Sequence, residues 1–123
     1  MIEHPTDTSA ALPAAVLWDF DGTLIDTEPI WIAQEYAVAE QLGGHWNDDL
    51  AHANIGNSLL NTGAALRYAA GRDDLTDAQV TDLLVAKVVA QLREAELVWR
   101  PGVAELLDEL TAAGVACALV SAS

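Results

Sequence analysis

The sequence predicts an α/β fold in which two parallel strands are separated by a long helical insertion. Two short runs, residues 14–20, apolar except for Asp19, and residues 115–120, apolar throughout, are typical of strands that helices cover on both faces of a parallel sheet. Between them the apolar residues recur at helical spacing, and a further helical segment directly precedes the second run. A strand, a helical insertion, a helix and a strand in this order belong to the α/β class.

The composition supports a folded domain and restricts its partners. Of the 123 residues, 52% are hydrophobic, and the formal net charge is −14 at pH 7. So much apolar surface excludes a disordered protein, and so strong a negative charge argues against binding to nucleic acid or to an anionic membrane surface. All five Lys and Arg side chains lie from Arg67 onward, so few positive side chains can hold an anionic substrate. Such a substrate would have to be bound by local dipoles or a metal ion.

The cysteine content and the absence of a leader indicate the compartment. The single cysteine, Cys117, cannot close an intramolecular disulfide, and its apolar run predicts a buried thiol in a reducing setting. No Lys or Arg precedes Arg67 to begin a secretory leader, and no apolar run approaches the about 20 residues of a membrane helix. We therefore expect a soluble, cytoplasmic protein.

The first 26 residues are expected to hold a tail, a strand and a loop. Residues 1–13 are polar and contain two prolines, which predicts a flexible tail. Residues 14–26 follow as the first core strand and its loop, because the apolar run stops at the turn signal Asp21-Gly22.

Residues 27–98 carry the helical insertion, for which we expect three or four helices. Gly43 ends the first of them, and residues 58–70 repeat the helical pattern. Thr76 with Gln79 forms a capping box that opens a further helix.

Residues 99–123 are expected to form a core helix and the second strand. Pro101-Gly102 interrupts the chain, and apolar residues then follow at helical spacing as far as Gly114. Strands that are apolar on both faces need further strands beside them, so the sheet is expected to be incomplete. The alternative is a compact two-stranded domain that its few helices cover.

Two carboxylates make the end of the first strand a candidate site. Asp19 and Asp21 lie at its carboxyl edge, where ligands bind in open α/β sheets. It is costly to keep two neighbouring carboxylates ionised unless a cation lies between them, and without a cation one of them takes a proton. The pair therefore indicates either a hard metal ion or a nucleophile beside a general acid. Asp also begins many turns, so the pair alone leaves a structural role open.

The longer string around this pair resembles a known family. Val16–Glu28 (VLWDFDGTLIDTE) resembles the first signature motif of the haloacid dehalogenase-like hydrolase superfamily, and Leu119–Ser123 resembles the second. The resemblance implies a Rossmannoid core with an inserted helical cap over residues 27–98, as in the phosphatase and β-phosphoglucomutase-like subfamilies. Within this cap, the loop around Asn54–Asn57 is the expected specificity loop, with a plain turn between two helices as the alternative.

The resemblance also implies roles for four residues. Asp19 matches the nucleophile that forms an aspartyl-phosphate, and Asp21 matches the general acid/base. The Asp19 carboxylate and the Asp21 main-chain carbonyl would bind Mg²⁺. The Ser121 hydroxyl, helped by the Ala122 N–H, would bind the transferring phosphoryl group.

The implied activity is Mg²⁺-dependent hydrolysis of a small phosphomonoester. A β-phosphoglucomutase-like phosphomutase is the nearest alternative, and a non-catalytic binding or phospho-acceptor module is another. A dehalogenase is disfavoured, because that branch lacks an acid at the position of Asp21. Only two of the four family motifs are present, which predicts the N-terminal portion of a longer enzyme and little turnover by these residues alone.

Overall fold

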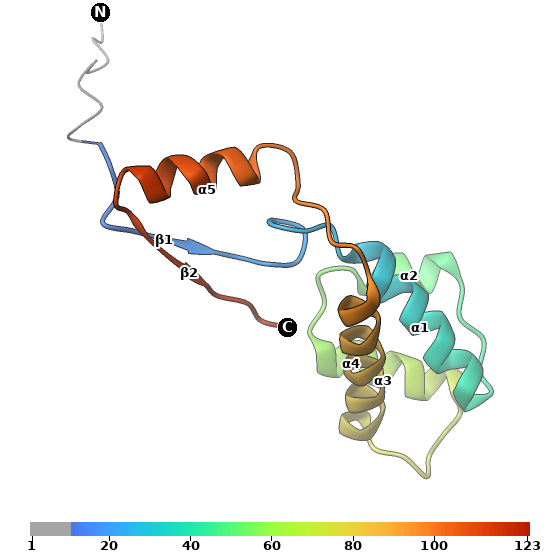
Figure 1. Cartoon of the computed structure of the whole chain (residues 1–123). Coiled ribbons are helices and arrows are strands. Elements are labelled where there is room, and N and C mark those ends of the chain that lie inside the picture. The colour runs from blue at the N-terminus through green and yellow to red at the C-terminus, as the bar shows by residue number, and fades with distance from the viewer. Residues whose placement is uncertain (1–10) are drawn as a thin grey trace, which may run out of the picture. The chain divides into compact units, whose positions relative to one another are not determined.

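The computed structural model describes residues 11–123, which form five helices and two strands (Figure 1). Residues 1–10, most of the predicted tail, lie outside the described residues. The α/β class is confirmed. In chain order the elements are β1 (Ala15–Trp18), α1 (Glu28–Leu42), α2 (Asp48–Asn54), α3 (Leu59–Ala70), α4 (Asp77–Glu94), α5 (Val103–Ala112) and β2 (Ala116–Leu119).

The described residues divide into two compact units. The strand unit combines the chain up to Asp26 with Val98–Ala122, and the helical unit is Thr27–Leu97. The strand unit contains β1, α5 and β2, and the helical unit contains α1 to α4, within the predicted number of three or four helices. None of the described helices is both long and apolar enough to cross a lipid bilayer.

In the strand unit, β1 and β2 pair in parallel along their whole length. The register runs from Ala15 opposite Ala116 to Trp18 opposite Leu119. Helix α5 runs along the two strands (Figure 1). A small apolar core joins the helix to the strand and to the loop that follows it; it consists of Leu24, Ile25 and Val103, with Trp18, Phe20 and Leu107 packed against them.

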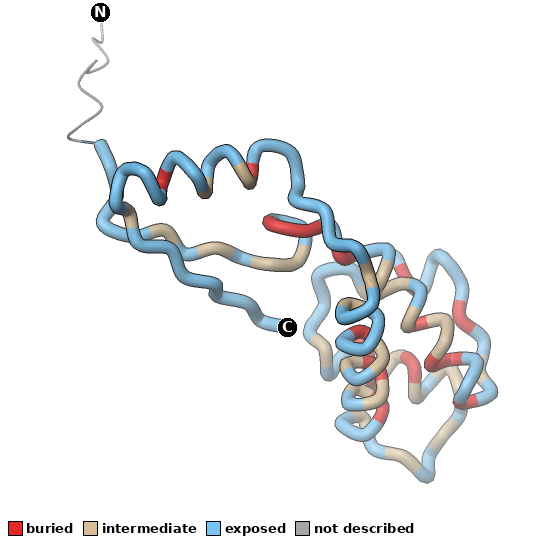
Figure 2. The backbone as a smooth tube through the Cα atoms, viewed as in Figure 1, coloured by how far each residue is buried: buried red, intermediate tan, exposed pale blue. Residues whose placement is uncertain are grey.

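The expectation that both strands are buried on both faces is wrong for the described residues. Residues of β1 alternate between exposed and half-buried, and β2 is exposed throughout (Figure 2). Leu17 and Leu119 expose 69% and 62% of their surface, and Cys117 is exposed rather than buried. The reason is that each strand has one neighbouring strand here and α5 is the helix beside the pair. Apolar side chains thus remain in contact with water despite their sequence pattern.

Both strands are also shorter than the apolar runs that predict them. The runs cover residues 14–20 and 115–120, whereas each strand has four residues. After Trp18 the chain no longer continues as a strand beside β2, because the Phe20 carbonyl accepts hydrogen bonds within the following turn.

In the helical unit, α1, α3 and α4 pack around one apolar core. Apolar side chains that leave water contribute roughly 1.5–3 kcal/mol each, so this core is the main source of the unit's stability. Gly43 ends α1 as predicted, with a φ of 80° that suits glycine because it has no Cβ. The buried core residues are Val38, Ala39, Leu42, Trp46, Ala51, Leu66, Val80, Leu84 and Val88.

The predicted capping box at the start of α4 is confirmed. The Gln79 N–H donates to the Thr76 hydroxyl oxygen at 3.1 Å, and the Thr76 N–H donates to the Gln79 side-chain oxygen at 2.9 Å. Two N–H groups that the first helical turn leaves without a backbone partner are therefore satisfied.

We expect Thr76→Ala to lower the free energy of unfolding by about 1 kcal/mol, because the Gln79 N–H loses its acceptor. Urea denaturation of the full chain, followed by far-UV circular dichroism, measures this loss. Thr76→Ser keeps the hydroxyl and should retain most of the stability. An alanine variant as stable as the parent chain would contradict a structural role for this cap.

Candidate active site

The carboxyl ends of β1 and β2 form the candidate site, which lies within the strand unit. Because the strands are parallel and Trp18 stands opposite Leu119, the residues after each strand emerge at the same edge of the sheet. The Val120 N–H donates to the Trp18 carbonyl at 2.7 Å and extends the pairing to this edge. The structure therefore places the Asp19–Asp21 segment and the Ser121–Ala122 segment at one edge.

The chain after β1 turns tightly around one carbonyl group. The Phe20 oxygen accepts hydrogen bonds from the N–H groups of Thr23, Leu24 and Ile25, at 3.2, 3.0 and 3.3 Å. Gly22 donates its own N–H to the Ile25 oxygen at 2.8 Å and has a φ of 75°. Because this left-handed conformation is strained for residues that carry a Cβ, glycine is what permits the turn directly beyond Asp21.

The carboxylate of Asp19 is exposed at the start of this turn. The Thr23 hydroxyl donates to Asp19 Oδ2 at 3.3 Å, which is long for a hydrogen bond between oxygens and therefore weak. A stronger ligand can replace this contact at small cost. Asp21 is half-buried, and its backbone forms an isolated bridge with Ile25. The link between Asp19 and Thr23 is one that sequence reasoning missed, although their spacing of four residues across a glycine turn signals it.

Buried side chains and two backbone contacts hold the loop to the segment before α5. Leu24 and Ile25 expose only 7% and 6% of their surface. Ile25 forms an antiparallel bridge with Trp99, and the Arg100 N–H donates to the Leu24 oxygen at 2.9 Å. Segments far apart in the sequence thus fix the position of the turn that carries the two aspartates.

The donor atoms of the turn suit a hard cation in type but supply only part of its shell. Mg²⁺ prefers oxygen ligands and keeps several waters where a protein offers one or two carboxylates. The Asp19 carboxylate and the Asp21 carbonyl are oxygen donors of this kind. Within residues 11–123, no group of three or more His, Cys, Asp or Glu side chains is placed to hold a metal ion. The turn therefore offers oxygen donors of the right type, and a hard cation bound there would take the rest of its shell from substrate and water.

The loop expected to choose the substrate lies in the helical unit and is ordered by its own side chains. The Asn54 amide donates to the Leu50 oxygen at 2.8 Å. Asn57 Oδ1 accepts from the Asn61 amide and from the Ser58 N–H, both at 3.0 Å. These hydrogen bonds orient the amide groups of the loop without a ligand.

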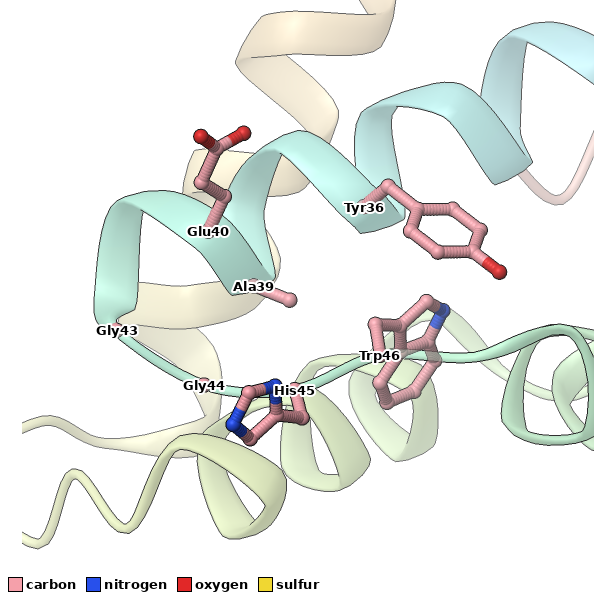
Figure 3. A pocket seen from close by; sticks show the side chains of 7 residues that line it. All are labelled: Tyr36, Ala39, Glu40, Gly43, Gly44, His45 and Trp46. Atoms are coloured by element: carbon pink, nitrogen blue, oxygen red, sulfur yellow. The ribbon is translucent and has the colours of Figure 1, made fainter.

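A groove of about 370 Å³ also lies in the helical unit, at the end of α1 (Figure 3). It contains none of the site residues that the sequence predicts. Figure 3 shows Trp46 and His45 on the connection that follows α1, across the groove from Ala39. The groove is lined by Tyr36, Ala39, Glu40, Gly43, Gly44, His45 and Trp46.

Comparisons with known proteins point to one family. The family model described as haloacid dehalogenase-like hydrolase matches residues 16–123. The protein CbbY of Rhodobacter capsulatus is 31% identical over 116 residues, which cover 87% of this chain and 49% of that protein. The CbbY protein of Cereibacter sphaeroides is likewise 31% identical, over 114 residues.

Solved structures give the same result. A crystal structure of CbbY from Rhodobacter sphaeroides in complex with phosphate has a TM-score of 0.74 at 25% identity, over 89% of this chain and 51% of that chain. A protein from Thermotoga maritima, provisionally identified as a beta-phosphoglucomutase, has a TM-score of 0.67 at 26% identity, over 89% and 50%. The chain spans about half the length of the relatives that it matches.

Proposed function

Since the chain belongs to the haloacid dehalogenase-like hydrolase family, we propose that its protein hydrolyses a small phosphomonoester through an aspartyl-phosphate on Asp19. The observation that carries the proposal is the parallel pairing of β1 with β2, which brings Asp19 and Ser121 to one edge of the sheet. An exposed carboxylate with one weak hydrogen bond is suited to attack an incoming group.

In the proposed reaction, Asp19 Oδ attacks the phosphorus atom while the bond from phosphorus to the leaving alcohol oxygen breaks. The Asp21 carboxyl group gives its proton to that oxygen. The same carboxylate then takes a proton from a water molecule that attacks the phosphorus, which releases phosphate and restores Asp19.

The other end of the site would hold the phosphoryl group. We assign the Ser121 hydroxyl and the Ala122 N–H as its donors, because both follow β2 at the edge where Asp19 follows β1. Directed donors of this kind stabilise the charge that develops during phosphoryl transfer.

Magnesium is the proposed cofactor, with the Asp19 carboxylate and the Asp21 carbonyl among its ligands. A bound Mg²⁺ would neutralise negative charge on the phosphoryl oxygens. This chemistry fits a chain with a formal net charge of −14, which otherwise repels an anionic substrate.

We assign substrate choice to the helical unit, Thr27–Leu97, as the cap of the enzyme. Its Asn54–Asn57 loop offers amide groups that are already oriented by local hydrogen bonds. Such a preorganised loop binds a polar leaving group without a large loss of side-chain entropy. The phosphate in the CbbY structure supports a small phosphorylated substrate.

The test is an assay of the complete gene product with a panel of phosphomonoesters, with Mg²⁺ or with EDTA. Phosphate release that requires Mg²⁺ is the expected result. The similarity to the Thermotoga maritima protein favours a phosphomutase as the second candidate, which would move a phosphoryl group from one position of a sugar phosphate to another without net release. If no substrate of the panel shows phosphate release or interconversion, both functions are refuted.

A further inference from the structure

The Asp19 carboxylate has one hydrogen-bond donor among residues 11–123. This donor is the Thr23 hydroxyl, which lies 3.3 Å from Asp19 Oδ2, and both side chains are exposed. A carboxylate offers about four lone-pair sites on its two oxygens, so the contact occupies only a small part of its capacity. The remaining sites stay open to a reacting group or to a cation.

The turn after β1 fixes the backbone of Thr23. The Thr23 N–H donates to the Phe20 oxygen at 3.2 Å, and the Leu24 N–H donates to the same oxygen at 3.0 Å. Leu24 is buried in the core of the strand unit, and its oxygen accepts from the Arg100 N–H at 2.9 Å. The Thr23 side chain is therefore exposed, but it projects from a backbone that its neighbours hold in place.

A threonine side chain on a fixed backbone has few positions for its hydroxyl. The branch at its Cβ restricts rotation about the Cα–Cβ bond. Asp19 differs, because it is exposed and has no branch at Cβ, so several staggered rotamers are open to its side chain. The better-fixed hydroxyl of Thr23 thus selects the rotamer of the less restrained carboxylate.

The length of this contact suits orientation rather than stabilisation. A strong donor would draw negative charge from the carboxylate and make it a poorer nucleophile, whereas a donor at 3.3 Å draws little. A weak contact between two exposed side chains also adds little to the stability of the fold. Hydrogen bonds of catalytic groups are often long before the substrate binds and shorten in the complex.

We propose that Thr23 is a positioning residue, whose hydroxyl holds the Asp19 carboxylate in the orientation that attacks phosphorus. The inference rests on the proposed phosphoryl transfer and adds one residue to it. In the step concerned, a bond forms between an Asp19 oxygen and phosphorus while the bond from phosphorus to the leaving oxygen breaks. Thr23 keeps its proton throughout. It therefore affects the rate at which Asp19 is phosphorylated, and not the affinity for the substrate.

Thr23→Val in the complete gene product tests the proposal, because valine has nearly the shape of threonine but no donor. The measurement is the single-turnover formation, at saturating Mg²⁺, of a phosphoenzyme that hydroxylamine cleaves. We expect its maximal rate to fall about three- to tenfold, which corresponds to the loss of one hydrogen bond. The substrate concentration that gives half the maximal rate should stay within about twofold of the parent value. An unchanged maximal rate would overturn the proposal.

Two further variants show whether the hydroxyl is the cause. Thr23→Ser keeps the donor, so it should form the phosphoenzyme within about twofold of the parent rate. Thr111→Val is the matched control, because Thr111 is exposed in α5 of the same unit and its hydroxyl donates to the Leu107 oxygen at 2.8 Å. This control should react at the parent rate. Thr23→Ser as slow as Thr23→Val would overturn the proposal.

Unfolding measurements and the parent protein complete the test. Thr23→Val should have the same midpoint of urea denaturation as the parent, and a slow variant that is also clearly less stable would assign Thr23 a structural role and overturn the proposal. Failure of the proposed function looks different, because the parent protein would then form no phosphoenzyme and release no phosphate. A parent that forms the phosphoenzyme, with Thr23→Val equally fast, refutes only the role of Thr23.

Discussion

Asp19→Asn is expected to reduce Mg²⁺-dependent phosphate release by at least about a thousandfold. The amide is a poor nucleophile, and its neutral oxygen is a weaker ligand for a divalent cation than a carboxylate. The measurement is the ratio of kcat/KM between the parent and the variant of the complete gene product, with the best substrate from the panel. Retention of activity within tenfold would show that Asp19 is not the nucleophile.

The same variant should fold normally, which separates chemistry from structure. Asp19 is exposed and has one weak hydrogen bond, so its loss should leave the unfolding transition almost unchanged. Asp108→Asn is the matched control, because Asp108 is an exposed residue of α5 in the same unit. This control should retain full activity. A covalent phosphoenzyme that hydroxylamine cleaves should form in the parent protein and be absent from Asp19→Asn.

Gly63→Ala is expected to lower the stability of the helical unit by about 1–3 kcal/mol. A Cβ at this position of α3 would lie 2.0 Å from Thr81 Oγ1 and 2.9 Å from both the Asp77 oxygen and the Thr81 nitrogen. These are atoms of α4, two of them in its backbone, so the two helices would have to separate. This cost exceeds the gain of about 1 kcal/mol that alanine brings to a helix. Urea denaturation of the full chain measures the difference.

Two further variants show whether helix packing is the cause. Ala90→Gly makes the reverse exchange at an exposed position of α4, and it should destabilise the chain by about 1 kcal/mol. Adding Thr81→Ala to the Gly63→Ala chain removes the shortest contact but leaves both backbone contacts, so the stability should recover only in part. A Gly63→Ala chain more stable than the parent would contradict the close approach of α3 to α4.

Local rules predict the ends of the helices well. Gly43, Thr76 and Gln79 act where the sequence places them, because capping depends on one turn of backbone and on side chains within three residues of it. The turn at Asp21-Gly22 follows from the same kind of rule. The parallel pairing of the strands, predicted from their apolar runs and the helices between them, places Asp19 and Ser121 at one edge.

The sequence by itself determined the α/β class, the helical insertion, the helix caps and the order of the motif residues, because these depend on spacing along the chain. Only the tertiary structure decided which of these residues lose contact with water. Leu119 and Cys117 belong to an apolar run and yet are exposed, whereas Glu35 is charged and yet is buried. Burial depends on which elements pack against a residue, and the hydrogen-bond donor to Glu35 is a tryptophan eleven residues away. The periodicity of one segment carries no information about such a partner.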